Sequence, residues 1–109
     1  MPDLEGVEFH PEAVLELEEA LYWYDQQDVP GLALRFAQEV QRVVHLISEH
    51  PEIGRRWGLE DDEDVRRFPT SDFPFHVVYT ARVRLVVLAI AHQRRRPVYW
   101  LHRADDDQG

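Results

Sequence analysis

Cysteine and lysine are both absent from this chain of 109 residues. Without cysteine there can be no disulfide bonds, no thiolate metal ligands and no cysteine nucleophile. Because all 12 basic residues are arginines, any phosphate or carboxylate has to be contacted by guanidinium groups. No ammonium group is available as a general base.

Membrane-spanning and secretion signals are also missing. The longest apolar stretches, such as residues 85–91, are far shorter than the ~20 residues that cross a bilayer. Residues 1–12 are acidic and lack the apolar run of a signal peptide. We therefore expect a cytoplasmic protein without a membrane partner. Its length suits one domain over residues 1–109, with the core in residues 7–103 and a frayed acidic tail at residues 104–109.

Residue patterns for metal, cofactor or nucleophilic chemistry do not occur either. The six histidines lack ligand spacing, and His45 and His50 are five residues apart, off a common helical face. There is no glycine-rich phosphate loop, no nucleophile elbow and no Ser–His–Asp order. The sequence predicts no metal site and no cofactor.

Charge is distributed unevenly between the two halves of the chain. Residues 65–104 carry eight arginines against Asp72, a local net charge of +7, whereas residues 1–52 carry twelve acids against two arginines, a net of −10. The formal charge of the whole chain is −9. A domain with such opposed halves is predicted to present one face to an anionic partner and another to a cationic one.

Apolar periodicity predicts two helices followed by strands. An apolar stripe from Val14 to Tyr24, at spacings of three and four residues, predicts a helix from Pro11 to about Gln27. A second stripe predicts a helix over residues 32–49, packed on the first as an antiparallel hairpin. The predicted strands cover residues 7–9, 65–68, 73–80 and 83–91.

The segment at residues 83–91 is apolar on both faces beyond Arg84, which favours a central place in the sheet. The glycines and acids of residues 51–64 predict a surface loop, and residues 97–101 could form a last short strand or a cover.

His92 directly follows this strand and precedes Arg94, Arg95 and Arg96. A histidine beside guanidinium groups is suited to acid–base chemistry on a phosphodiester. The alternative is a histidine that only ends the strand through its hydrogen bonds.

Arg66 and Arg67 are neighbours on a predicted strand, so they should point to opposite faces of the sheet. One of them could hold a phosphate bidentately together with the arginines after His92. The alternative is that both only balance nearby acids in surface ion pairs worth less than ~1 kcal/mol each. In the loop, Arg55, Arg56 and Trp57 could form a charged stacking surface, or Trp57 could hold the loop against the core.

Two aromatic pairs are candidates for partner contacts. Of Tyr22 and Trp23 on the first helix, one should be exposed, which indicates a partner surface. Tyr99 and Trp100 could bind a partner, although at least one of them is expected to close the core.

Four segments together resemble a known family over roughly residues 7–103. They read FHPEAVLELEEALYWY, GLALRFAQEVQRVVHLISEHPEIG, VRRFPTSDFPFHVVY and LAIAHQRRRPVYW. The chain resembles the ParE/RelE superfamily of type II toxin–antitoxin toxins, and its ending and long helix hairpin are closer to the ParE-like branch. The resemblance implies an α+β fold of order β-α-α-β-β-β, with an N-terminal strand and a helix hairpin packed on a small, mainly antiparallel, twisted sheet.

The resemblance also implies a function. ParE-like members poison DNA gyrase and cleave nothing, whereas RelE-like members cleave mRNA on the ribosome. The absence of lysine and the net acidity favour the first, and a homologue that only binds an antitoxin is a third alternative. In each case a cognate antitoxin, in a toxin–antitoxin hetero-oligomer, is the implied partner.

Three sets of residues follow from these interpretations. If the chain is a ribonuclease, the expected catalytic residues are His92, Arg66, Arg67, Arg94 and Tyr99. The residues expected to contact the target are Arg94, Arg95, Arg96, Tyr99, Trp100 and Arg103. The residues expected to contact the antitoxin are Tyr22, Trp23, Arg66 and Arg84.

Overall fold

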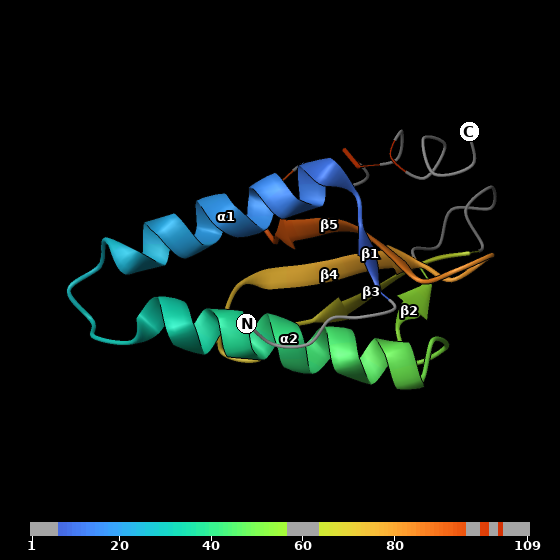
Figure 1. The fold of residues 1–109 in the computed structure, drawn as a ribbon, viewed down its shortest axis with the longest axis horizontal. Coiled ribbons are helices and arrows are strands. Elements are labelled where there is room, and N and C mark those ends of the chain that lie inside the picture. Colours follow the sequence, from blue (N-terminus) through green and yellow to red (C-terminus); the bar gives the residue numbers. More distant parts are fainter. Residues whose placement is uncertain (1–6, 57–63, 96–98, 101–102, 104–109) are drawn as a thin grey trace.

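The computed structural model of the chain describes residues 7–56, 64–95, 99–100 and 103. Two helices, α1 (Pro11–Asp25) and α2 (Leu32–Glu49), form an antiparallel hairpin on one face of a five-stranded sheet (Figure 1). The strands are β1 (Glu8–Phe9), β2 (Arg55–Arg56), β3 (Val65–Pro69), β4 (Phe75–Thr80) and β5 (Val86–His92). The α+β class and the helix hairpin predicted from the sequence are confirmed.

The order of strands across the sheet is β1-β5-β4-β3-β2. β1 is parallel to β5, and the remaining pairs are antiparallel. The prediction that the last strand is central is therefore wrong, because β4 occupies the middle. β5 is apolar on both sides because both of its faces are covered, by the helices and by a cluster around Trp100.

β2 is a strand that the sequence analysis placed inside a surface loop. It consists of two exposed arginines, so it carries no apolar alternation from which a strand could be predicted. Pairing with β3 makes it an edge strand of the sheet. Trp57 and most of the acidic run that follows lie outside the described residues, as does the tail at residues 104–109.

Local signals account for the ends of the helices. α1 begins at Pro11, and the Nδ1 atom of His10 accepts a hydrogen bond from the Glu12 N–H at 3.1 Å, so His10 caps the helix. α2 follows Gly31, whose φ of 77° suits a residue without a side chain. It ends before Pro51, as predicted, because the residue before a proline avoids helical backbone angles.

The main core lies between the helices and the sheet. Tyr24 and Phe36 from the two helices stack with Phe73 and Phe75, with ring centroids 5.0–6.4 Å apart. A second cluster on the opposite face of the sheet gathers around Trp100, which is only 1% exposed. This second cluster fixes the C-terminal aromatic segment on the sheet. Within the described part of the chain, no helix is long and apolar enough to cross a membrane.

Candidate functional site

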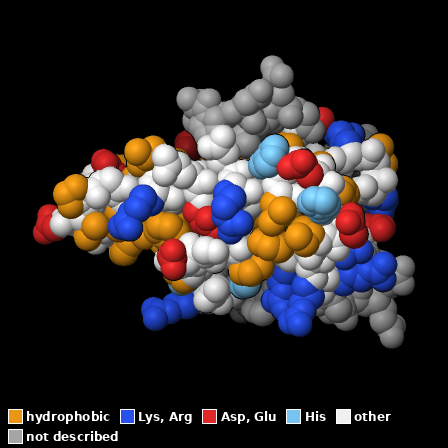
Figure 2. Space-filling model, turned by 90° about the horizontal axis from the view of Figure 1, so that it is seen from below, with side chains coloured by type: hydrophobic (Ala, Val, Ile, Leu, Met, Phe, Trp, Pro, Cys, Tyr) orange, Lys and Arg blue, Asp and Glu red, His pale blue; other side chains and the backbone are white. Residues whose placement is uncertain are grey.

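The arginines of the C-terminal half do not form the single surface that the sequence predicted. Arg82 pairs with Asp64 at 2.7 Å, and Arg84 pairs with Glu8 at 2.9 Å. On the face seen in Figure 2, basic and acidic side chains alternate across the middle, whereas basic side chains gather along the lower edge. The fold causes this mixing, because pairing of β1 with β5 brings the acidic N-terminal half beside the segment that leads into β5.

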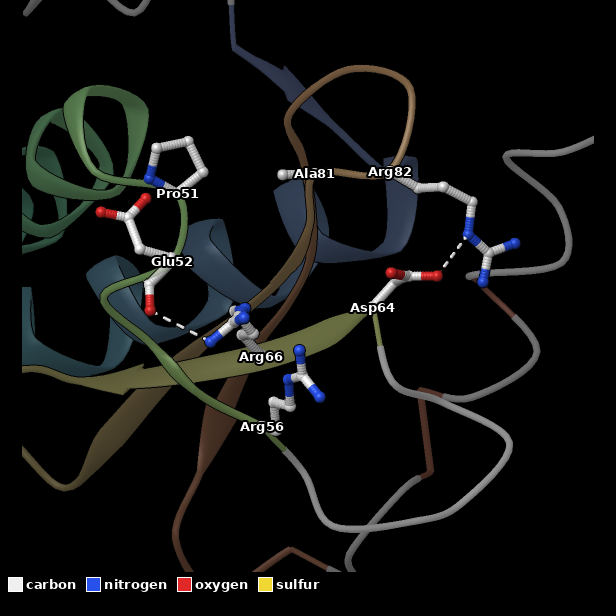
Figure 3. Close-up of a pocket in the computed structure, with 7 residues that line it drawn as sticks. All are labelled: Pro51, Glu52, Arg56, Asp64, Arg66, Ala81 and Arg82. Carbon is white, nitrogen blue, oxygen red and sulfur yellow. Dashed lines mark hydrogen bonds and ion pairs between the residues drawn. The ribbon is translucent and has the colours of Figure 1, made fainter.

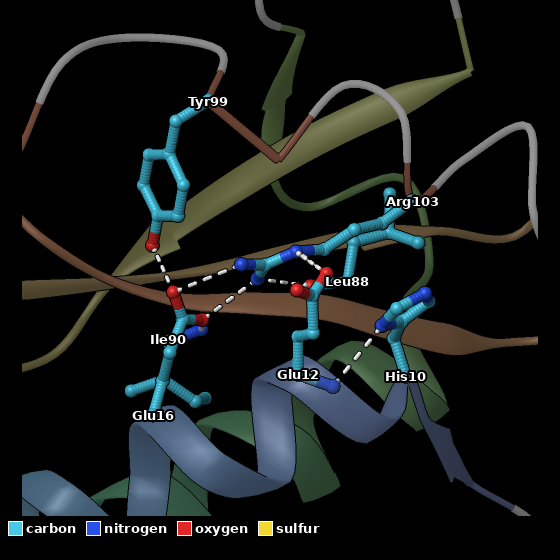
Figure 4. A network of polar contacts seen from close by, with 7 residues as sticks. All are labelled: His10, Glu12, Glu16, Leu88, Ile90, Tyr99 and Arg103. Carbon is cyan, nitrogen blue, oxygen red and sulfur yellow. Dashed lines mark hydrogen bonds and ion pairs between the residues drawn. The ribbon is translucent and has the colours of Figure 1, made fainter.

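Arg103 is buried in a polar network between α1 and β5 (Figure 4). Its Nε donates to Glu12 at 3.1 Å, and its Nη1 donates to Glu16 at 2.9 Å and to the carbonyl of Leu88 at 3.0 Å. Glu16 also accepts hydrogen bonds from the Tyr99 hydroxyl and from the N–H of Ile90. The network ties three segments that are distant in the sequence.

Three of the expected target contacts are buried or hydrogen-bonded within the protein. Arg103 and Trp100 are 5% and 1% exposed, and the Tyr99 hydroxyl is occupied by Glu16. Burial and the hydrogen bond to Glu16 raise the pKa of Tyr99 well above its ordinary range, so its hydroxyl stays protonated. In this conformation Trp100 and Arg103 have a structural role and the Tyr99 hydroxyl is engaged, while a direct contact of these side chains with a target stays a prediction.

His92 ends β5 as a hydrogen-bonding residue. Its Nδ1 accepts the N–H of Arg94 at 3.0 Å, and its ring lies edge-on to Phe75 with centroids 5.0 Å apart. Arg94 is exposed, and the Arg95 guanidinium lies over the Tyr99 ring at 4.1 Å. The turn after β5 thus presents two arginines, while Arg96 lies outside the described residues.

An apolar pocket of roughly 350 Å³ adjoins this turn. It is lined by Ala20, Trp23, Tyr24, Pro74, Phe75 and His92. On α1, Tyr22 and Trp23 are 69% and 58% exposed, so both are exposed where only one was predicted to be. Exposed aromatic side chains on an acidic helix remain the strongest indication of a protein-binding face.

Arg66 and Arg67 point to opposite faces of the sheet, as strand alternation predicts. Arg66 is paired with Tyr79, which belongs to the helix-side core. Arg67 is paired with Val78, which belongs to the cluster on the other face. Burial lowers the pKa of His76, and the positive charge of Arg67 lowers it further by a smaller amount.

The predicted combination of Arg66 with His92 does not form. Arg66 is paired with Tyr79 of β4, and Tyr79 is paired with Val87 of β5. Val87 lies five positions before His92 on β5. At a rise of ~3.3 Å per residue this is roughly 16 Å along the strand, with a further distance of about 10 Å across two strands. The Arg66 guanidinium is also held by the carbonyls of Glu52 and Gly54, beside β2 and away from β5, so Arg66 and His92 do not meet at one phosphate in this structure.

A second pocket, of roughly 220 Å³, lies at the β2–β3 edge (Figure 3). It is lined by Pro51, Glu52, Arg56, Asp64, Arg66, Ala81 and Arg82. Arg66 Nη1 donates to the backbone carbonyls of Glu52 at 3.0 Å and of Gly54 at 2.8 Å. The Arg82–Asp64 pair forms another wall.

Tyr79 supports this pocket from the core. Its hydroxyl accepts the Gly54 N–H at 2.9 Å and donates to the Pro51 carbonyl at 2.7 Å. A Cβ atom on Gly54 would lie 2.5 Å from that hydroxyl, so only glycine allows this close approach. Burial raises the pKa of Tyr79, which keeps its hydroxyl available as a donor.

Sequence reasoning missed Glu16 and Tyr79. Neither has a role predicted from the sequence: Glu16 is one of the twelve acids of residues 1–52, and Tyr79 falls within the predicted strand at residues 73–80. The spacing of Glu12 and Glu16 places them one helical turn apart, which could have indicated a shared cationic partner. No local pattern identifies Arg103 as that partner. Among the residues that the structure describes, no group of three metal-ligating side chains occurs.

Comparison with known proteins gives the family. The sequence matches the family described as "ParE toxin of type II toxin-antitoxin system, parDE" over residues 7–97. A solved structure described as "Chromosomal ParDE TA system from P. aeruginosa" has a similar fold, with a TM-score of 0.66 and 17% identity, covering 82% of this chain and 96% of that chain. No curated protein sequence matches the chain. Because the family match covers most of its length, the chain belongs to the ParE toxin family of type II toxin–antitoxin systems.

Proposed function

We propose that this toxin inhibits DNA gyrase and is neutralised by a cognate antitoxin. The observation that carries the proposal is the family match over residues 7–97. For ParE-like toxins, the resemblance implies poisoning of DNA gyrase rather than cleavage of mRNA.

The arrangement of the side chains supports a toxin that does not cleave RNA. General acid–base catalysis requires each catalytic group within hydrogen-bond reach of the reacting atoms. The Cα atoms of Arg66 and His92 are on the order of 20 Å apart by the strand geometry above, and the Arg66 guanidinium is held by the carbonyls of Glu52 and Gly54. The Tyr99 hydroxyl is held by Glu16. The RelE-like alternative therefore has no assembled set of catalytic residues in the described part of the chain.

Arg94 and Arg95 are the proposed target contacts. Both are exposed on the turn after β5, and no carboxylate of the described residues pairs with either of them. Arg95 is oriented by its contact with the Tyr99 ring. Trp100 and Arg103 act indirectly in this proposal, because they hold Tyr99 and the turn in place.

Antitoxin binding is proposed for the outer side of α1 and for the opposite end of the sheet. Tyr22 and Trp23 lie near the end of α1, whereas Arg66 and Arg84 lie toward the end of the sheet where β5 begins. The molecule is 42 Å long, so one antitoxin must run along it to reach both regions. An extended or partly helical segment that folds on binding has this reach.

Supercoiling of relaxed plasmid by purified gyrase tests the target. The wild-type chain should inhibit, and the double variant Arg94→Gln, Arg95→Gln should need about tenfold more protein for the same inhibition. Arg35→Gln is the matched control, since Arg35 is an exposed arginine on α2. Full supercoiling at a large excess of wild-type chain would refute gyrase as the target. Primer extension on translated mRNA should show no new cuts, and codon-dependent cuts would favour the ribonuclease instead.

A further inference from the structure

We propose that the pocket at the β2–β3 edge binds a terminal phosphate group, either free inorganic phosphate or the phosphate of a nucleoside monophosphate. This site is separate from the proposed gyrase contacts at Arg94 and Arg95. Arg56 and Arg66 are the residues that would hold the phosphate.

The first argument is the pairing of like charges across the strand ladder. Arg56 lies directly opposite Arg66, and Arg55 lies directly opposite Arg67. Like charges at directly opposed positions destabilise a sheet, and an edge strand of two residues has little else to hold it. An anion bound between Arg56 and Arg66 would relieve this repulsion.

The second argument is that the site is preorganised. Two backbone carbonyls fix the guanidinium of Arg66 through Nη1, which leaves its Nε and Nη2 donors for a ligand. Those carbonyls belong to the loop held by the Tyr79 hydroxyl. Figure 3 shows the guanidinium groups of Arg56 and Arg66 close together in the pocket. Little conformational entropy is then lost when an oxyanion binds.

The third argument concerns charge and size. Arg82 is already compensated by Asp64, and the Glu52 carboxylate points away from the two central guanidinium groups in Figure 3. Arg56 and Arg66 therefore supply two positive charges to one anion. A terminal phosphate carries about −1.5 to −2 at neutral pH, whereas a carboxylate or a phosphodiester carries −1. A pocket of roughly 220 Å³ has room for such a group.

Isothermal titration calorimetry with inorganic phosphate and with dAMP, at constant ionic strength, measures the binding. Arg56→Gln should weaken both ligands about tenfold or more, because a charge-assisted hydrogen bond is lost. Arg55→Gln is the matched control, since it is the neighbouring exposed arginine on the same strand and points to the other face. It should change the affinity less than about twofold. Tighter binding of dAMP than of phosphate would identify the nucleotide as the source of the group.

Three results would overturn the proposal. One is the absence of binding to the wild-type chain, and another is an equal loss for Arg55→Gln and Arg56→Gln, which would indicate unspecific attraction. The third is tighter binding of a DNA duplex or of a glutamate-rich peptide than of either phosphate ligand. In addition, Arg56→Gln should unfold at the same or a higher temperature than wild type in phosphate-free buffer of low salt, and a lower temperature would refute the argument from repulsion. None of these measurements involves gyrase or the antitoxin, so a failure to bind phosphate would leave the proposed target untouched, although the phosphate site shares Arg66 with the proposed antitoxin contact.

Discussion

Replacing Glu16 with alanine should lower the free energy of unfolding by about 3 kcal/mol. The Glu16 carboxylate is only 12% exposed and accepts hydrogen bonds from Ile90, Tyr99 and Arg103. Hydrogen bonds to a charged group contribute about 1.5–3 kcal/mol each, but they are not additive. Arg103 would keep Glu12 and the Leu88 carbonyl as partners, which limits the loss to the lower end of the range for a broken buried ion pair.

Urea unfolding followed by circular dichroism measures this loss, and an unchanged m value would show that the transition stays two-state. Glu19→Ala is the control, because Glu19 is an exposed acid on the same helix and should cost less than about 0.5 kcal/mol. Combining Glu16→Ala with Arg103→Met should recover about 2 kcal/mol relative to the sum of the single changes, since no buried charge is then left without its partner. A loss for Glu16→Ala as small as that for Glu19→Ala would refute the network as a stabilising element.

Further changes test other contacts. The pKa of the Tyr99 hydroxyl is raised above its ordinary value of 10.0 in the folded protein, so above pH 10 the unfolded chain loses the hydroxyl proton first. The free energy of unfolding of the wild type should therefore fall as the pH rises past 10, and it should fall less in Tyr99→Phe. Because the pKa of His76 is lowered in the folded protein, the free energy of unfolding should decrease as the pH falls below 6.5, and His76→Gln should remove this part of the acid sensitivity. A variant, Tyr99→Phe or His76→Gln, whose stability depends on pH as that of the wild type does would contradict the prediction for that residue. Gly54→Ala should cost about 3 kcal/mol through its clash with Tyr79, whereas Gly31→Ala, with open space around it but a φ of 77°, should cost only about 1 kcal/mol; equal losses in thermal unfolding would count against this difference.

The helices and most strands could be predicted because the spacing of apolar residues within each segment shows which of its side chains are buried. On α1, Leu17, Leu21 and Tyr24 of the predicted stripe face the same core as the stripe of α2, so spacing locates both helices. Val14, the first residue of the predicted stripe, is instead 38% exposed. The same reasoning wrongly predicted β5 as the central strand, because a strand that is buried on both faces need not lie in the middle of the sheet. It missed β2 because Arg55 and Arg56 are exposed on a two-residue edge strand.

The candidate site was less predictable because its contacts join distant parts of the chain. Glu16 and Arg103 are 87 positions apart, so nothing in the local sequence assigns this ion pair. The charge difference between the two halves suggested separate surfaces, but opposite charges that the fold brings together form pairs instead, as Arg84 does with Glu8. By contrast, the opposite directions of Arg66 and Arg67 follow from strand alternation alone.

Incorporation of labelled thymidine and labelled methionine, measured in the first minutes after the toxin is induced without its antitoxin, separates the two proposed targets most directly. A gyrase inhibitor should stop thymidine incorporation while methionine incorporation continues, and the Arg94→Gln, Arg95→Gln variant should lower thymidine incorporation much less than the wild-type chain at the same expression. An early loss of methionine incorporation, or normal growth with the wild-type chain, would contradict the proposal that this protein acts on DNA gyrase.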